Sequence, residues 1–153
     1  MKKDVLFLIA QFFLFAFYFF EIENKSHLLP NWAGYGLATL IAIGFLIIIF
    51  GIVNLNDNLT AFPAPKKNSE LISNGIYKYI RHPIYTGIII AMLAFAGYTI
   101  SYFKMLITFV LAVVFYFKSK LEETYLMDRH QEYILYKEKT GRFLPKIRYS
   151  KKE

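Results

Sequence analysis

The sequence predicts an all-α polytopic membrane protein with about four transmembrane helices and a cytosolic amphipathic helix near the C-terminus. Of its 153 residues, 56% are hydrophobic, and the mean hydropathy of +0.38 lies above the range of soluble globular domains. The apolar residues gather in four runs, while most charged residues lie between these runs or after the last one. The length fits a single domain that covers residues 1–153.

The first two predicted spans are residues 5–20 and 33–53. Residues 5–20 are interrupted only by Gln11, and a helix of this length covers about 24 Å, slightly less than the ~30 Å hydrocarbon core. A cleavable signal peptide would also place lysines before an apolar run, but no small-x-small cleavage site follows, so we expect a retained anchor. Residues 33–53 carry no charge and form the clearest span.

The last two predicted spans are residues 84–100 and 102–117. Little more than Ser101 separates them, which predicts a tight helical hairpin. Beyond this hairpin, apolar residues recur at helix-like intervals over residues 121–139 among many charges. We therefore expect an amphipathic helix there that extends out of the last span and stops near Gly141.

The segment from residue 59 to residue 80 has no strong helical period and contains Pro63 and Pro65. We expect a long ordered loop. Loops of this length in compact chains are usually functional or disordered, and this one leads directly into the most unusual stretch of the sequence, which favours a function.

The distribution of lysine and arginine predicts the orientation in the membrane. With four spans, 16 of the 18 cations fall on the side that holds both termini and the loop before His82, whereas Lys25 and Lys104 lie opposite. The positive-inside rule makes the crowded side cytoplasmic. Because the cations flank apolar runs, the net charge of +7 indicates topology signals and anionic lipid rather than nucleic acid.

Composition also limits the chemistry. The chain has no cysteine, which excludes disulfides, thiolate metal sites and cysteine nucleophiles. Its three histidines, His27, His82 and His130, are scattered, so we expect no histidine-built metal centre.

The stretch from Gly75 to Gly87 places rings, cations and a proline directly before the third span. Pro83 suits the first turn of a helix, because its φ is fixed and it lacks an N–H that would go unpaired there. Arg81, His82 and Tyr85 should then lie at the membrane boundary beside free helix-start N–H groups, where the helix dipole favours an anionic ligand group.

Two ordered motifs resemble those of a known enzyme group. Residues 81–87, Arg-His-Pro-Ile-Tyr-Thr-Gly, resemble the RHPxYxG signature of the isoprenylcysteine carboxyl methyltransferase and phospholipid methyltransferase group of integral membrane enzymes. Residues 122–126, Glu-Glu-Thr-Tyr-Leu, are similar to its EExxL motif. Tyr133, Tyr136, Arg142 and Pro145 resemble its closing pattern, so the resemblance covers about half of the chain, residues 71–145.

The resemblance implies S-adenosylmethionine as cofactor and a lipophilic or small methyl acceptor at the bilayer. It implies a cofactor-binding part at residues 62–87 and 118–145, with cofactor contacts from Leu71, Ile72, Tyr77, Arg81, His82, Tyr85, Glu122 and Glu123, and from the adjoining Ser69 and Glu70. These residue types suit the ligand, because aromatic faces tolerate a sulfonium, helix-start donors bind a carboxylate and a glutamate binds an ammonium. No residue is assigned as catalytic.

Lys118 and Arg142 are the expected substrate contacts. Lys118 falls where the prenylcysteine enzymes place an arginine, and a lysine lacks the two-pronged geometry of a guanidinium, so a prenylcysteine substrate does not follow. Carboxylate, thiol, amine and phospholipid headgroup acceptors all stay open, as does the oligomeric state.

Other interpretations of the same residues stay open. Arg81, His82 and Tyr85 also fit an interfacial belt, Glu122 and Glu123 fit a solvated pair beside Lys118 and Lys120, and Arg142 fits a lipid phosphate contact. The alternative functions are a membrane sterol-type reductase that uses NADPH and a non-catalytic membrane scaffold or channel component.

Overall fold

Helices and turns make up the part of the chain that the computed structural model describes, residues 2–20, 29–64 and 70–146. The α-helices are α1 (Lys2–Tyr18), α2 (Asn31–Leu55), α3 (Pro83–Tyr98), α4 (Tyr102–Arg129) and α5 (Tyr133–Lys139), and the 3₁₀ turns are η1 (Asn56–Asn58) and η2 (Gly75–Lys78). Within these residues the only β pairing is an isolated bridge between Ile80 and Gly141. The predicted all-α class is confirmed.

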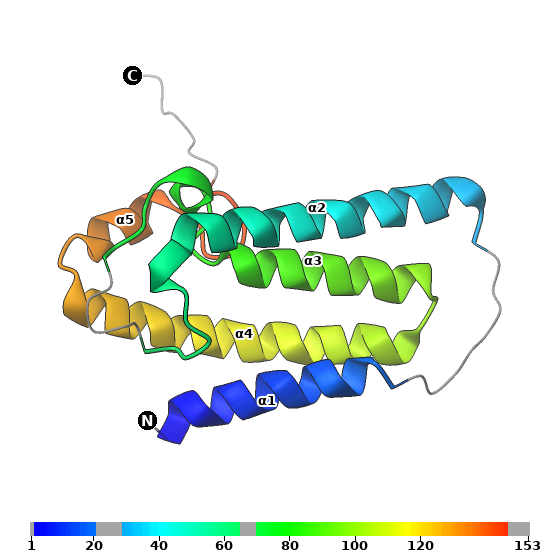
Figure 1. Ribbon diagram of the computed structural model, residues 1–153, viewed down its shortest axis with the longest axis horizontal. Helices are drawn as coiled ribbons and strands as arrows, with labels where there is room; N and C mark the ends of the chain where they lie inside the picture. The colour runs from blue at the N-terminus through cyan, green and yellow to red at the C-terminus, as the bar shows by residue number, and fades with distance from the viewer. Residues whose placement is uncertain (1, 21–28, 65–69, 147–153) are drawn as a thin grey trace.

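The four long helices lie side by side in the order α2, α3, α4, α1, and neighbouring helices run in opposite directions (Figure 1). A turn of three residues joins α3 to α4, which form the tight hairpin expected from the sequence. Ser101 caps the start of α4, because its hydroxyl accepts a hydrogen bond from the Lys104 N–H. The start of α1, the end of α2, the start of α3 and the end of α4 therefore meet at one end of the molecule, where α5 also lies.

Glycines allow α2 and α3 to pack closely. A Cβ on Gly44 would lie 2.8 Å from both the Ala91 nitrogen and the Gly87 oxygen, and a Cβ on Gly87 would lie 2.6 Å from the Gly44 oxygen. Small residues at such crossings let helix backbones approach within a membrane, where van der Waals packing drives helix association. Gly36, earlier on α2, has open space around it.

Large apolar side chains cover the outside of the helices. Only Gly44 and Gly51 are buried in α2, while Phe45 and Phe50 of the same helix are each 56% exposed and Phe109 of α4 is 69% exposed. A continuous apolar exterior of this kind marks a surface that contacts membrane lipid.

Two helices among the described residues, α2 and α4, are long and apolar enough to cross a membrane. The predicted spans 5–20 and 84–100 fall on α1 and α3, which have 17 and 16 residues. These helices measure about 26 Å and 24 Å, less than the ~30 Å hydrocarbon core, so length and composition support two of the four expected spans.

The expectation of one amphipathic helix over residues 121–139 is wrong. Helix α4 continues from the predicted span to Arg129, His130 adopts an extended conformation, and α5 begins at Tyr133. The break turns α5 back across the end of the bundle, where the Tyr136 hydroxyl donates to the Tyr77 carbonyl at 2.6 Å. The loop predicted at residues 59–80 contains η2, and its residues 65–69 lie outside the described residues. Residues 21–28, between the first two predicted spans, also lie outside them.

We predict that Gly44→Ala destabilises the protein by about 1–3 kcal/mol, because the added methyl group would meet the backbone of α3 rather than a flexible side chain. Thermal unfolding of purified protein in detergent measures the effect. Gly36→Ala is the matched control on the same helix and should unfold at or slightly above the wild-type temperature. Equal stability of the two variants would contradict the close crossing.

Candidate functional site

The stretch before α3 is held by the C-terminal segment. The Arg81 N–H donates to the Gly141 carbonyl at 2.9 Å, and the His82 N–H donates to the Arg142 carbonyl at 3.0 Å. The Thr86 hydroxyl, one turn into α3, donates to the Phe143 carbonyl at 2.8 Å. The two segments implied by the resemblance, residues 62–87 and 118–145, are therefore joined through their backbones.

Gly75 lets η2 dock against the end of α2. Its φ of +53° is in the left-handed region, and a Cβ there would lie 2.0 Å from the Asn54 side-chain oxygen, so no other residue fits without a shift. That oxygen accepts the Ile76 N–H at 2.9 Å. The docking buries Tyr77 and brings its hydroxyl within 3.3 Å of the Gly51 carbonyl.

His82 lies between two carboxylates of α4. Its Nδ1 is 3.3 Å from Glu122 Oε2 and its Nε2 is 3.3 Å from Glu123 Oε1. The side chains of successive helix residues point in different directions, so the two carboxylates can contact the two nitrogens of one imidazole ring. Only the imidazolium form has a donor for each carboxylate, and this arrangement therefore favours the charged histidine.

Burial alone would lower the pKa of His82, because desolvation penalises the charged ring. Hydrogen bonds to Glu122 and Glu123, together with their negative charges, outweigh burial and raise the pKa of His82 above its ordinary value of 6.5. His82 lies directly before the first residue of α3, at the end of the helical bundle and outside the predicted spans.

Stacked rings fix the position of the imidazole. His82 stacks on Tyr85 with 5.6 Å between ring centroids, and Tyr85 stacks on Phe115 of α4 with 4.3 Å. The Tyr85 hydroxyl also donates to Glu122 Oε1. Each oxygen of Glu122 thus faces a ring from the segment around the start of α3.

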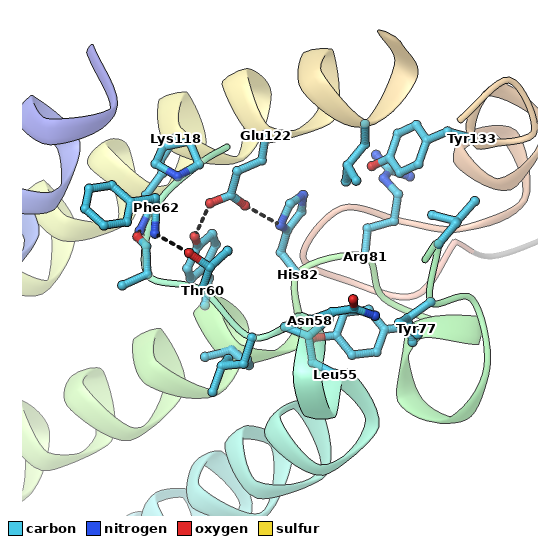
Figure 2. A pocket seen from close by; sticks show the side chains of 18 of the residues that line it. Leu55, Asn58, Thr60, Phe62, Tyr77, Arg81, His82, Lys118, Glu122 and Tyr133 are labelled. Carbon is cyan, nitrogen blue, oxygen red and sulfur yellow. Dashed lines mark hydrogen bonds and ion pairs between the residues drawn. The ribbon is translucent and has the colours of Figure 1, made fainter. Parts of the chain in front are cut away.

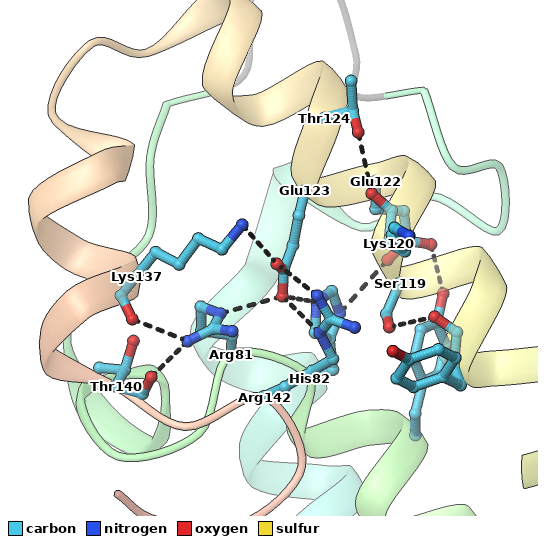
Figure 3. Close-up of polar contacts among 12 residues, drawn as sticks. Arg81, His82, Ser119, Lys120, Glu122, Glu123, Thr124, Lys137, Thr140 and Arg142 are labelled. Carbon is cyan, nitrogen blue, oxygen red and sulfur yellow. Dashed lines mark hydrogen bonds and ion pairs between the residues drawn. The ribbon is translucent and has the colours of Figure 1, made fainter.

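Glu123 is the centre of an ion cluster (Figure 3). Its carboxylate is 1% exposed and accepts the Arg81 Nε–H at 3.0 Å and two N–H groups of Arg142 at 2.9 Å each, while Lys137 Nζ lies 3.4 Å away. Arg81 also donates to the carbonyls of Lys137 and Thr140 at the end of α5. One buried carboxylate therefore joins the start of α3, α4, α5 and the C-terminal segment.

A cavity of about 500 Å³ lies beside this cluster (Figure 2), within the size range of small-molecule sites. All five α-helices contribute to its lining, which consists of Gln11, Leu55, Asn58, Leu59, Thr60, Ala61, Phe62, Pro63, Glu70, Leu71, Ile72, Tyr77, Arg81, His82, Ile84, Tyr85, Ile88, Lys118, Glu122, Leu126, Tyr133 and Tyr136.

Most of the residues expected at the site line this cavity. They are Leu71, Ile72, Tyr77, Arg81, His82, Tyr85, Glu122 and Lys118, with Glu70 beside them. Glu123 and Arg142 instead pair with each other behind the lining. Tyr79, another aromatic residue in the stretch from Gly75 to Gly87, is 58% exposed and lies outside the lining. Ser69 lies outside the described residues.

Lys118 is 1% exposed and is held by two acceptors. Its Nζ donates to Gln11 Oε1 at 2.7 Å and to the Ala61 carbonyl at 2.9 Å, and it lies 5.3 Å from the centre of the Tyr85 ring. A buried ammonium of this kind needs such partners to offset its desolvation.

The loop at residues 59–80 was expected to be functional, and residues 59–63 and 70–72 line the cavity. Sequence reasoning did not assign Gln11, Leu126, Tyr133 or Tyr136 to the site as individual residues. Gln11 had a signal, because it is the only polar residue within its apolar run. Tyr133 and Tyr136 belong to the closing pattern that resembles the family's, but neither was assigned to the site. Tyr133 is 1% exposed, and its hydroxyl makes no hydrogen bond to any described residue.

We predict that His82 contributes most to stability in mildly acidic solution. A raised pKa in the folded state means that this stabilisation is complete below pH 6.5 and is lost as the pH rises through the higher folded-state value. His82→Asn, which carries no charge, should therefore differ most from wild type in unfolding temperature near pH 6 and least in alkaline solution. A difference that grows with pH would contradict the imidazolium assignment.

Comparison with known protein families identifies the family of this chain. A family model described as phospholipid methyltransferase matches residues 32–132, about two-thirds of the chain, from the start of α2 to the break after α4. No curated protein and no solved structure was found to match. The resemblance seen in the sequence is confirmed, whereas the reductase and scaffold alternatives gain no support. On the strength of this match, the chain belongs to the phospholipid methyltransferase family, a group of membrane methyltransferases.

Proposed function

We propose that the protein is an S-adenosylmethionine-dependent methyltransferase that modifies a lipophilic or small acceptor at the membrane, with an activity similar to that of protein-S-isoprenylcysteine O-methyltransferases. The observation that carries the proposal is the contact of His82 with Glu122 and Glu123, each at 3.3 Å, at the wall of a cavity of about 500 Å³. When bound, the cofactor supplies a methyl group activated by its sulfonium.

The lining has the groups that such a cofactor needs. Glu122 offers a carboxylate to an ammonium, the Tyr77 and Tyr85 rings offer faces to a sulfonium, and Arg81 and His82 place positive charge near a carboxylate. The buried Tyr133 hydroxyl, which makes no hydrogen bond to a described residue, is a further indication, because such a group is costly unless a ligand satisfies it. The residues therefore fit the cofactor.

Catalysis in this proposal depends on position and on the exclusion of water. The segments 58–63 and 70–72 cover the cavity with mostly apolar side chains, and Ile84 and Ile88 of α3 form an apolar wall. A largely apolar site of this kind can hold two reactants in line for displacement, and binding of the reactants would displace water and strengthen the electrostatic contacts around them.

Lys118 is the proposed substrate contact. Arg142, the other candidate, is already engaged with Glu123, and its guanidinium lies 5.2 Å from the centre of the Tyr116 ring. We therefore assign Arg142 to the support of His82 through Glu123.

We further propose that α1, α2, α3 and α4 all cross the bilayer and that the site faces the cytosol. The shorter helices lie alongside the two longer ones (Figure 1), and the end that holds the site carries most of the lysines and arginines. A cofactor from the cytosol would then reach the cavity directly.

Binding of S-adenosylhomocysteine to the purified protein in detergent tests this function. We expect Glu122→Gln and His82→Ala to weaken binding at least tenfold, since each removes a charged group of the lining. NADPH serves as the competing cofactor. Tight NADPH binding without binding of S-adenosylhomocysteine would reverse the assignment.

Tyr133→Phe and Tyr136→Phe form a matched pair, because both rings line the cavity and, among the described residues, only the Tyr136 hydroxyl has a hydrogen-bond partner. Tyr133→Phe should keep the unfolding temperature of the ligand-free protein but weaken binding of S-adenosylhomocysteine by about 10-fold. Tyr136→Phe should lower the unfolding temperature, since it leaves the Tyr77 carbonyl without its donor. Unchanged ligand affinity of Tyr133→Phe would contradict a role for that hydroxyl.

A further inference from the structure

The exposed side of α5 is apolar. Tyr133 and Tyr136 of this helix line the cavity, whereas Ile134 and Leu135 between them are 55% and 59% exposed and lie outside the lining. A helix of the bundle itself exposes such side chains to the bilayer, but α5 lies beyond the end of α2, where the spans give way to loops. Its exposed side therefore needs an explanation of its own.

The C-terminal segment extends this apolar side. Leu144 is 72% exposed, and Lys146 Nζ donates to the Glu138 carbonyl at 2.8 Å, which holds the segment beside the last turn of α5. Tyr79 is 58% exposed, and its carbonyl accepts the Gly141 N–H at 3.4 Å. These contacts gather large exposed side chains around α5 and the turn that follows it. The α5 patch consists of Tyr79, Ile134, Leu135 and Leu144.

Contacts with α2 place the α5 patch at the boundary of the membrane. The apolar exterior of α2 continues to Val53, which is 65% exposed. The Tyr77 hydroxyl lies 3.3 Å from the Gly51 carbonyl of α2, and the Tyr77 carbonyl accepts the Tyr136 hydroxyl at 2.6 Å. Only one residue therefore separates α5 from the last turns of α2, and α5 lies where the lipid-facing surface ends and lipid headgroups begin.

Exposed lysines surround the α5 patch. They are Lys78, Lys139 and Lys146, and they outnumber Glu132 and Glu138, the exposed acids of α5 and its N-terminal turn. An apolar patch with lysines at its rim suits a bilayer surface that contains anionic lipid. The apolar side chains enter the boundary between headgroups and acyl chains, and the ammonium groups meet the phosphates.

The other side of α5 belongs to the candidate site. Tyr133 and Tyr136 contribute to the cavity wall, and Lys137 Nζ lies 3.4 Å from the Glu123 carboxylate. Arg81, another lining residue, donates to the Lys137 carbonyl at 3.1 Å. A lipid surface that holds α5 in place would therefore also hold one wall of the cavity.

We propose that the α5 patch docks on the anionic surface of the cytosolic leaflet and that this docking stabilises the cofactor-binding form of the cavity. Docking follows from the patch itself, whereas its effect on the cofactor rests on the proposed methyltransferase function. Linkage requires that the cofactor favour docking by the same factor by which docking favours the cofactor.

Tryptophan fluorescence of the full chain in nanodiscs with brominated, quenching lipids tests the docking. Trp32 is the one native tryptophan, so Trp32→Phe gives a background in which Leu135→Trp reports on the patch. Gln131→Trp is the control, because Gln131 is exposed in the turn between α4 and α5, which forms the outer tip of this end (Figure 1).

The tryptophan at position 135 should be quenched at least about twofold more strongly than the one at position 131, and phosphatidylglycerol should increase the difference over phosphatidylcholine alone. Equal quenching at the two positions, or a difference that phosphatidylglycerol leaves unchanged, would overturn docking on an anionic surface. A soluble partner would then be the better occupant of the patch.

Affinity for S-adenosylhomocysteine in the same two membranes, without bromine, tests the effect on the cavity. Wild type should bind about fivefold more tightly when phosphatidylglycerol is present. Lys139→Gln combined with Lys146→Gln should lose this gain. Lys120→Gln is the control, because it removes an exposed lysine of α4 outside the patch, and it should keep the gain. No gain in wild type, or a gain kept by the double variant, would overturn the effect on the cavity.

The two proposals fail in different ways. Absence of S-adenosylhomocysteine binding in both membranes, together with stronger quenching at position 135, would overturn the methyltransferase proposal and leave docking standing. Normal S-adenosylhomocysteine binding with equal quenching at both positions would overturn docking and leave the methyltransferase proposal standing.

Discussion

The carboxylate of Glu123 is the contact on which the rest of the site depends. It is almost wholly buried and receives Arg81, His82 and Arg142 within 3.3 Å, with Lys137 slightly farther away. Removing a carboxylate from water is costly, and only several well-placed donors make such burial favourable. The donors come from three separate segments, so the same contact that neutralises the charge also joins the start of α3 to α5 and to the C-terminal segment.

The order and direction of the helices bring these groups together. The short turn between α3 and α4 makes the two helices antiparallel, so the start of one lies beside the end of the other. Close contact at Gly44 and Gly87 places α2 against α3, and Asn54 at the end of α2 anchors η2. Helix α1 contributes through Gln11, which holds Lys118 at the opposite side of the cavity from the ion cluster.

Much of this arrangement could be predicted from sequence. Long apolar runs predict helices, and a hairpin between the two motifs predicts that His82 lies near Glu122 and Glu123. The separate environments of the two glutamates could not be predicted, because helical phase alone does not say which carboxylate faces the cavity and which faces Arg142. The break at His130 could not be predicted, because no glycine or proline marks it. The turn is stabilised by contacts that only the folded chain makes, such as the hydrogen bond from the Tyr136 hydroxyl to the Tyr77 carbonyl.

Glu123 couples α4 to the C-terminal segment through Arg142. A double-mutant cycle with Glu123→Gln, Arg142→Gln and the double variant, read from unfolding free energies in detergent, tests it most directly. We expect each single change to destabilise the protein and the coupling energy to exceed about 1 kcal/mol, because the two N–H groups of Arg142 bind this carboxylate at 2.9 Å in a buried setting. Additive effects of the two substitutions would contradict the account.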